Sequence, residues 1–179
     1  MSKIGRRPIE IGNVKVEIKG NEVHYKGPKS SGVYTLPDNL AVGLEETLLM
    51  VTAKGNSDND RRLWGLHRAL LANVIKGASV EFEKQLQIEG LGYKAVLSGN
   101  KVVFSLGYSH KIDFQLPKGI SLEVDKTGQK LTFKSSNKEL VGHICSVIRA
   151  LRPPEPYKGT GIRLSTEIIK RKAGKTKAA

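Results

Sequence analysis

Two segments of the chain alternate apolar and polar residues and reverse direction at a Gly-Asn pair, a pattern typical of β-hairpins. The first turns at Gly20 and Asn21, and the second turns at Gly99 and Asn100. The alternating apolar positions are Val14, Val16, Ile18, Val23 and Tyr25 in the first segment and Ala95, Leu97, Val102 and Phe104 in the second. We therefore predict two hairpins of the same design.

The same further elements follow each hairpin. A third apolar segment ends at a proline in both cases, at residues 33–37 and 112–117, and a short strand is expected at residues 48–52 and 131–134. Mostly apolar residues at helical spacing then predict one helix in each copy. They are Trp64, His67, Leu71, Val74 and Ile75 in the first helix and Leu140, Val141, Ile144, Val147, Ile148 and Leu151 in the second.

The residues around the two predicted helices suit their ends. Ser57 or Asp58 can cap the first helix, and Gly77 is expected to end it. Asn137 can cap the second helix, and Pro153 stops it because proline has no backbone N–H and clashes with the preceding turn.

The two sets of elements predict an internal duplication. The hairpins align at an offset of 79 residues and the helices at 76, so small insertions or deletions separate the copies. We expect an α+β fold of two tandem similar domains, each a mostly antiparallel β-sheet covered on one face by a helix. The N-terminal domain is placed at residues 1–81 and the C-terminal domain at residues 82–179. Residues 83–97, interrupted by Gly90 and Gly92, are interpreted as one strand with a bulge or bend.

Charge points to an anionic partner. The 179 residues carry a net charge of +13, and nucleic acid is the commonest partner for such a basic chain. A membrane surface is less favoured, and no apolar run approaches the roughly 20 residues that span a bilayer. The start of the chain lacks an apolar signal segment. The single cysteine, Cys145, suits a reducing compartment, so we expect a cytoplasmic protein without a membrane partner.

Catalysis has little support in the sequence. The four histidines occur in no metal-binding spacing, and Cys145 falls inside an apolar helix, where a buried and inert thiol is expected. The segment at residues 158–161 looks superficially like a phosphate loop but lacks the order of Gly and Lys in that motif. We therefore expect no enzyme activity, no metal and no cofactor.

The prolines and glycines at residues 153–162 determine which conformations the backbone of this segment can adopt. Its three prolines exclude a continuous helix and favour a stiff, nearly extended arm. Gly159 and Gly161 allow a tight turn or a close approach to another surface, and Tyr157 and Lys158 place an aromatic ring beside a cation. This combination favours a grip on a polyanion.

The tail behind this arm concentrates positive charge. Residues 153–179 carry +5 of the net charge, which leaves +8 for the rest of the chain. A solvated, flexible end is the alternative, but the stiff arm beside the tail favours phosphate contacts. The candidate RNA-binding residues here are Tyr157, Lys158, Gly159, Thr160, Gly161, Arg163, Lys170, Arg171, Lys172, Lys175 and Lys177.

Two other places offer weaker candidates. A short basic arm surrounds Gly5 near the N-terminus, although a frayed end is nearly as good an interpretation. The loop after Gly107 combines an aromatic ring, a hydroxyl, an imidazole and a cation. The candidates at these places, with two residues that precede the second hairpin, are Lys3, Arg6, Arg7, Tyr93, Lys94, Ser109, His110 and Lys111.

Four peptides together resemble one known family. They are KIGRRPI at residues 3–9, EGLGYKA at 89–95, LGYSH at 106–110 and PPEPYKGTGI at 153–162. In this order, over nearly the whole chain, they resemble the bacterial-type large-subunit ribosomal protein six (the L-six family). The resemblance implies a structural role in the large ribosomal subunit, with rRNA bound chiefly by the C-terminal domain and basic tail. It also implies neighbouring large-subunit proteins as partners and a position near the sarcin-ricin loop and stalk base, where translational GTPases dock transiently.

Two residues depart from the family pattern. Thr160 stands where the family usually has a second Lys, so it offers a hydroxyl but no charge. Lys111 stands where the family usually has Pro, and it partly compensates if its loop faces RNA.

Two other classes of function fit less well. An RNA-processing or RNA-modifying enzyme with a basic arm would need clustered acid and base groups, which the sequence does not show. A DNA-architectural protein would favour a symmetric dimer or apolar wedges on an arm, whereas this chain is internally duplicated and its arm carries Tyr157.

Overall fold

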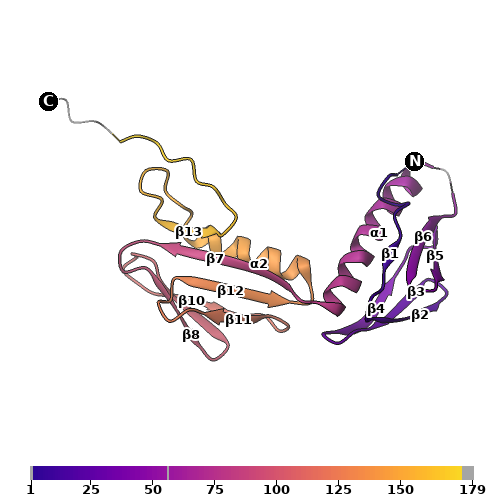
Figure 1. Ribbon diagram of the computed structural model, residues 1–179. Helices are drawn as coiled ribbons and strands as arrows, with labels where there is room; N and C mark the ends of the chain where they lie inside the picture. Colours follow the sequence, from indigo (N-terminus) through magenta and orange to yellow (C-terminus); the bar gives the residue numbers. More distant parts are fainter. Residues whose placement is uncertain (1, 56, 175–179) are drawn as a thin grey trace. The chain divides into compact units, whose positions relative to one another are not determined.

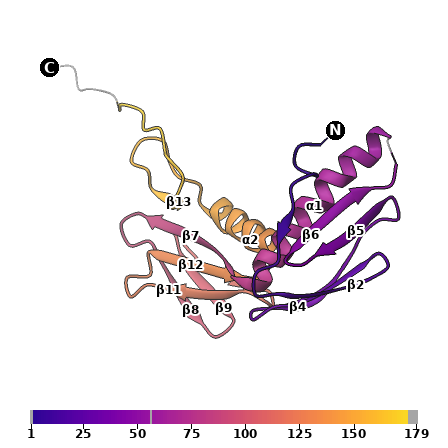
Figure 2. The same ribbon diagram turned by 45° about the vertical axis from the view of Figure 1, so that its right-hand side comes forward.

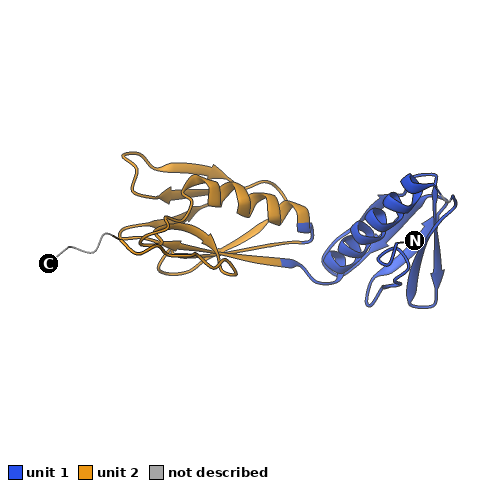
Figure 3. Ribbon diagram, turned by 90° about the horizontal axis from the view of Figure 1, so that it is seen from above, with its two compact units in different colours: residues 1–82, 136–138 blue, residues 83–135, 139–179 orange. Residues whose placement is uncertain are grey.

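The chain divides into two units. Figure 1 colours the chain from its N-terminus to its C-terminus, and Figure 3 gives each unit its own colour. Unit 1 contains residues 1–82 with 136–138, and unit 2 contains residues 83–135 with 139–179. The structure is a computed structural model that describes residues 2–55 and 57–174. The domain limits expected from the sequence, 1–81 and 82–179, stay a prediction.

Unit 1 packs two small antiparallel sheets and one helix around a single core. Its elements are β1 (Ile9–Glu10), β2 (Lys15–Lys19), β3 (Glu22–Lys26), β4 (Ser31–Thr35), β5 (Leu40–Glu45), β6 (Leu48–Ala53) and α1 (Asp58–Ser79). The sheets have the orders β2-β3-β4 and β1-β6-β5, and α1 packs against β1, β5 and β6 (Figure 2). Leu71 and Ile75 of α1 share the core with Ile9, Val23 and Leu49, so both sheets bury side chains under the same helix.

Unit 2 repeats this arrangement and adds one strand. Its elements are β7 (Phe82–Glu89), β8 (Lys94–Ser98), β9 (Lys101–Ser105), β10 (Ile112–Gln115), β11 (Ser121–Val124), β12 (Lys130–Ser135), α2 (Lys138–Leu151) and β13 (Gly161–Leu164). The sheets have the orders β8-β9-β10 and β11-β12-β7-β13. Phe104, Phe133, Ile148 and Ile162 are among the fully buried side chains of its core.

The strand orders confirm the predicted α+β fold and its duplication. The sheet β2-β3-β4 corresponds to β8-β9-β10, and β5-β6-β1 corresponds to β11-β12-β7. In each unit the helix follows the last of these strands in the chain, and β7 begins unit 2 as β1 begins unit 1. The structure refines the single predicted sheet per domain into two small sheets, and β13 has no counterpart in unit 1 among the described residues.

Two predicted helix ends are confirmed, since Ser57 caps α1 and α2 ends at Leu151, before Pro153, while the capping role of Asn137 stays a prediction. Ser57 caps α1, with its hydroxyl accepting from the Asp60 N–H at 3.1 Å while the Asp60 carboxylate accepts from the Ser57 N–H at 3.2 Å. The prediction that Gly77 ends α1 is wrong, because the helix continues to Ser79. A side chain at Gly77 would clash with Ser136 and approach Phe82, so this glycine serves close packing.

The prediction of one bent strand over residues 83–97 is also wrong. The chain leaves β7 at Glu89, turns through Gly90 and Gly92, both with positive φ, and enters a different sheet as β8. The two glycines therefore mark a transfer between sheets. Strands β5 and β11, which the sequence analysis did not predict, pair antiparallel with β6 and β12.

Candidate nucleic-acid interface

The segment after α2 forms a closed loop. The Ile162 N–H donates to the Arg152 carbonyl at 2.8 Å, and the Glu155 N–H donates to the Thr160 carbonyl at 2.9 Å. The Gly159 N–H closes the turn by donating to the Glu155 carbonyl at 3.0 Å. The predicted nearly extended arm is therefore wrong in form. The chain folds back because β13 pairs with β7 and buries Ile162 completely.

Both glycines of the loop are needed by the loop itself. Gly161 has φ 140°, and a Cβ there would lie 2.6 Å from the Pro153 carbonyl oxygen, which is backbone and cannot swing away. Gly159 has φ 77°, and its Cβ would lie 3.0 Å from the Arg171 guanidinium, which is the mobile end of a side chain. Gly161 therefore carries the stricter steric demand.

The turn of the loop presents an aromatic ring and a cation. Tyr157 is 53% exposed, and Lys158 beside it is exposed as well. Thr160, in contrast, donates its hydroxyl to the Glu155 carboxylate at 3.0 Å. Tyr157 and Lys158 are thus available to a ligand, while the Thr160 hydroxyl already has a partner within the loop.

Three arginines and two glutamates fix β13 and the start of the tail. Arg163 donates from Nε to Glu89 Oε1 at 2.8 Å, and Arg149 donates from Nε to Glu167 Oε2 at 2.8 Å. Arg171 Nη2 lies 3.6 Å from Glu89 Oε2. The hydrogen bonds between Arg149 and Glu167 hold the pKa of the carboxyl below its ordinary value and raise that of the guanidinium. The Arg163 guanidinium is likewise paired within the protein, with Glu89.

The tail is tied back to the loop. The Lys172 N–H donates to the Pro156 carbonyl at 2.8 Å, so the tail passes beside the turn that carries Tyr157. Lys170, Arg171 and Lys172 are all exposed. The candidates Lys175 and Lys177 lie outside the described residues.

Tyr93 connects two further loops of unit 2. A Cβ at Gly90 would lie 2.6 Å from the Tyr93 ring, and one at Gly107 would lie 2.7 Å from it. The ring therefore fits against two glycines that both have positive φ. This contact holds the β7–β8 connection against the β9–β10 loop, which carries the exposed residues Ser109, His110 and Lys111.

Arg152 joins these loops to the closed loop. Its guanidinium lies 4.8 Å from the centroid of the Tyr108 ring, and that ring stacks on His110 with centroids 6.1 Å apart. The Tyr108 hydroxyl donates to the Leu151 carbonyl at 3.1 Å, at the end of α2. Sequence analysis noted the aromatic ring of this loop but did not include Tyr108 among the candidate residues, and it missed Arg152, for which a cation directly before Pro153 was a signal.

These contacts bring together most of the predicted site. We call the exposed parts of residues 90–94, 107–111, 152–160 and 170–172 the tip loops. Lys94, Lys111, Lys158, Lys170 and Lys172 make no ion pair with a described residue, so their charges remain available. The tip loops thus combine unpaired cations with exposed aromatic rings.

The N-terminal candidates belong to unit 1. The segment before β1 packs on α1: a Cβ at Gly5 would lie 2.6 Å from the Trp64 ring, and Arg68 donates to the carbonyls of Arg7 and Pro8 at 2.9 and 2.7 Å. This packing argues against a frayed end. Lys3, Arg6 and Arg7 are exposed on the packed arm, and their role in binding stays a prediction.

Other kinds of site have less support. The described residues contain no group of three His, Cys, Asp or Glu side chains that could hold a metal ion. None of the described helices has the length and apolar character needed to cross a membrane. Cys145 is buried, and burial raises the pKa of its thiol to about 11, as expected of an inert cysteine.

Comparison with known proteins identifies close relatives. A model of the family Ribosomal protein L6 matches residues 89–164. The chain is 45% identical over 177 residues to large ribosomal subunit protein uL6 of Gloeothece citriformis, an alignment that covers 98% of each protein. It is 42% identical over 177 residues to the protein of the same name from Thermodesulfovibrio yellowstonii, with 98% of each covered. For that of Staphylococcus carnosus the identity is 44% over 177 residues, with 98% of this chain and 99% of the relative covered.

Proposed function

Because the chain belongs to the ribosomal protein L6 family, we propose that it is a structural constituent of the large ribosomal subunit that binds the rRNA of that subunit. The relatives are named as large-subunit proteins, and they align with nearly the whole chain rather than with one unit. The role is structural rather than enzymatic, and it places the protein on cytoplasmic ribosomes.

The composition of the tip loops is the observation that supports this assignment. Single-stranded and irregular RNA is commonly bound by aromatic rings that stack on bases together with cations that contact phosphates. Tyr157 and Lys158 supply such a pair on the closed loop, and Tyr108, His110 and Lys111 supply a second set. The Tyr108 ring is held by His110, Arg152 and its hydrogen bond to the Leu151 carbonyl, so little conformational entropy of this ring is lost on binding.

The internal ion pairs divide the arginines of unit 2 by role. Arg163 and Arg149 use their guanidinium groups on Glu89 and Glu167, so they position β13 and the loop. Lys158, Lys170 and Lys172 carry the phosphate contacts, with Lys94 and Lys111 beside them. Arg163 is therefore assigned a positioning role in the site rather than a direct contact with RNA.

The family resemblance also supports a position for the tip loops near the sarcin-ricin loop and the base of the stalk. The partners there are other large-subunit proteins, and translational GTPases come close transiently. In this arrangement unit 2 carries most of the affinity for RNA, and the arm with Lys3, Arg6 and Arg7 contributes less.

Directed hydroxyl-radical probing tests this function in assembled subunits. In a Cys145→Ala background, a single cysteine is placed at Lys158 in the tip loops or at the exposed Lys19 in unit 1, and an iron chelate is attached to it. The chelate at position 158 should cleave large-subunit rRNA strongly, including the sarcin-ricin loop, whereas position 19 gives a different and weaker pattern. Absence of the chain from purified large subunits would refute the assignment, and an uncleaved sarcin-ricin loop would refute the position.

A further inference from the structure

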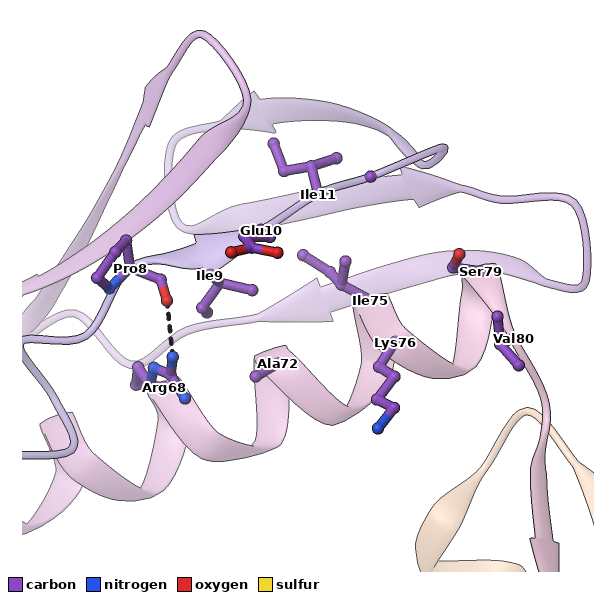
Figure 4. Close-up of a pocket in the computed structure, with 11 residues that line it drawn as sticks. Pro8, Ile9, Glu10, Ile11, Arg68, Ala72, Ile75, Lys76, Ser79 and Val80 are labelled. Atoms are coloured by element: carbon purple, nitrogen blue, oxygen red, sulfur yellow. Dashed lines mark hydrogen bonds between the residues drawn. The ribbon is translucent and has the colours of Figure 1, made fainter.

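Unit 1 has an open groove between β1 and α1, shown in Figure 4. The groove has a volume of about 560 Å³. Its apolar lining includes Ile9, Ala72 and Ile75, and its charged lining includes Glu10, Arg68 and Lys76. In Figure 4 the helix residues Ala72 and Ile75 lie across from Ile9 and Glu10 of the strand. The groove is thus bordered by a sheet edge on one side and a helix on the other.

The internal duplication shows what fills the corresponding place in unit 2. At the hairpin offset of 79, Ile9 and Glu10 of β1 align with Ile88 and Glu89 of β7. The outer edge of β7 pairs with β13, with Ile162 opposite Ile88 and Gly161 opposite Glu89. Among the described residues, no strand pairs with the outer edge of β1. Unit 1 therefore has a strand edge without a pairing strand among the described residues, whereas β13 covers the corresponding edge in unit 2.

The backbone of β1 is oriented for such a strand. The Ile11 N–H donates to the Thr47 carbonyl at 3.1 Å, toward β6. Because successive peptide groups of an extended strand point in opposite directions, the N–H and C=O of Glu10 point to the outer edge. In unit 2 the Ile88 N–H likewise donates inward, to the Gln129 carbonyl at 2.8 Å, while Glu89 pairs outward with β13. The outer edge at Glu10 is therefore a template for strand addition.

The helix residues explain why the place is open in unit 1. At the helix offset of 76, Arg68 and Ala72 align with Ile144 and Ile148, which share the unit 2 core with Ile162. The small side chain of Ala72 leaves space where Ile148 fills it. The Pro8 carbonyl accepts from Arg68 at 2.7 Å and can accept a second hydrogen bond, but Pro8 has no N–H to donate, so the backbone bonds of an added strand centre on Glu10.

The charges specify one residue of the missing strand. In unit 2 the Glu89 carboxylate accepts from Arg163 of β13 at 2.8 Å. Glu10, the aligned residue, is exposed and makes no ion pair with a described residue. A strand with Arg or Lys two positions after the residue opposite Glu10 would repeat the unit 2 ion pair.

We propose that the groove binds an extended segment of a partner protein, which adds to β1 as an antiparallel strand with a single basic residue placed for Glu10. The segment has a small residue opposite Glu10, then an apolar residue that enters the groove between Ala72 and Ile75, then Arg or Lys that pairs with the Glu10 carboxylate. Backbone hydrogen bonds to Glu10 provide affinity, and the apolar and basic side chains provide specificity.

A peptide with the sequence of β13 and its flanks is the probe. The peptide Gly-Thr-Gly-Ile-Arg-Leu-Ser-Thr, which copies residues 159–166, is titrated into the full-length chain labelled with ¹⁵N. Saturable shifts of the amide signals are expected at residues 9–12 and 72–76. Glu10→Arg should weaken this binding about tenfold, since like charges then face each other across the strand pair. A peptide with Glu in place of its Arg should recover binding to Glu10→Arg.

A second variant tests the groove separately from the charge. Ala72→Ile introduces the residue that α2 has at this register and should abolish the shifts at residues 9–12. Leu70→Ile, on an exposed part of α1 that does not line the groove, is the matched control, and thermal unfolding confirms that both variants fold. The proposal is overturned if the parent shows no shifts, if shifts are confined to residues 86–89, or if Glu10→Arg binds like the parent. It is also overturned if the groove proves to be an interface between two copies of this chain.

Discussion

The two copies of the fold use the edge next to the helix differently. In unit 2 the chain leaves α2, makes the closed loop at residues 152–160 and returns as β13 to cover the edge of β7. In unit 1 the chain leaves α1 at Ser79 and continues into β7, so the edge of β1 stays uncovered by any described strand. One connection therefore distinguishes a copy with a completed sheet from a copy with an open groove.

The same connection determines where positive charge is concentrated. The tail that follows β13 is held beside the loop by the Lys172–Pro156 hydrogen bond and by the ion pairs of Glu89 and Glu167. In unit 1 the basic arm precedes β1 and packs on Trp64 and Arg68 of α1. Both units thus anchor a basic segment, and in unit 2 this segment is tied to the turn that carries Tyr157.

The largest expected effect is a loss of stability when Gly161 of the closed loop is replaced. Gly161→Ala should lower the free energy of unfolding by about 3 kcal/mol, because φ is positive and the Cβ would clash with the Pro153 backbone. Gly20→Ala, in the unit 1 hairpin, has φ 62° but no atom within 4 Å of its Cβ, so about 1 kcal/mol is expected. Urea unfolding of both variants measures the difference. Equal losses would show that steric contact with Pro153 does not matter.

The next effect separates the tail from the N-terminal arm in RNA binding. Replacing Lys170, Arg171 and Lys172 by Gln should flatten the dependence of log affinity on log salt by about 2, since each lost phosphate contact removes about 0.7–0.9 from the slope. The same change at Lys3, Arg6 and Arg7 should flatten it less. Filter binding to large-subunit rRNA at a series of salt concentrations gives both slopes. Arg163 is left intact because its guanidinium is partly buried and hydrogen-bonded to Glu89 at 2.8 Å, whereas the Arg171 guanidinium is exposed and lies 3.6 Å from that carboxylate. Equal slopes for the two triple variants would contradict a dominant role of the tail.

Local periodicity explains how much of the fold can be predicted. The hairpins and helices are recognisable because their apolar residues recur every second residue or at helical spacing, and the duplication follows from their common order. Strand β1 has only two residues, too short for a periodic signal. Strand β13 lies between prolines and a polar tail, and it forms because it pairs with residues about 75 positions earlier in the chain. Pairing over such distances depends on tertiary structure, which sequence patterns do not report.

The candidate site shows a similar division. The residue types at positions 157 and 158 are enough to predict an RNA contact; both side chains are exposed in the fold, and the contact itself stays a prediction. The sequence does not reveal that Glu89 neutralises Arg163, because the two are 74 positions apart. The sequence also cannot show why a glycine is needed at position 161. A glycine that allows close approach of a ligand and a glycine that avoids a clash with the protein's own backbone look identical in sequence.

A smaller effect is the pH dependence of stability that comes from the ion pair of Arg149 and Glu167 in unit 2. The pKa of Glu167 is lowered in the folded state by its hydrogen bonds with Arg149. The stabilisation from this carboxylate is therefore complete above its ordinary pKa of 4.5 and is lost as pH falls through the lowered value. Glu167→Gln should cost about 1 kcal/mol at pH 7 and less at pH 3, where the stabilisation from the carboxylate is declining. Glu45→Gln in unit 1, whose carboxylate makes no ion pair with a described residue, is the control for urea unfolding at the two pH values. A constant cost at both pH values would show that the ion pair is not its source.

The smallest effect is expected at the one thiol of the chain. Cys145 lies in α2 at the register of Ala69 in α1, so Cys145→Ala replaces a buried sulfur with the residue that the first copy has there. The loss of stability should be about 1 kcal/mol, because one buried atom of moderate size is removed. Cys145→Ser should cost more, since its hydroxyl would need a hydrogen-bond partner in the core.

Both Cys145 variants should bind rRNA like the parent. The native thiol should react with a thiol reagent only as fast as unit 2 opens, because the thiol is buried and its pKa is about 11. Normal stability combined with lost RNA binding in Cys145→Ala would instead show that this thiol takes part in the interface.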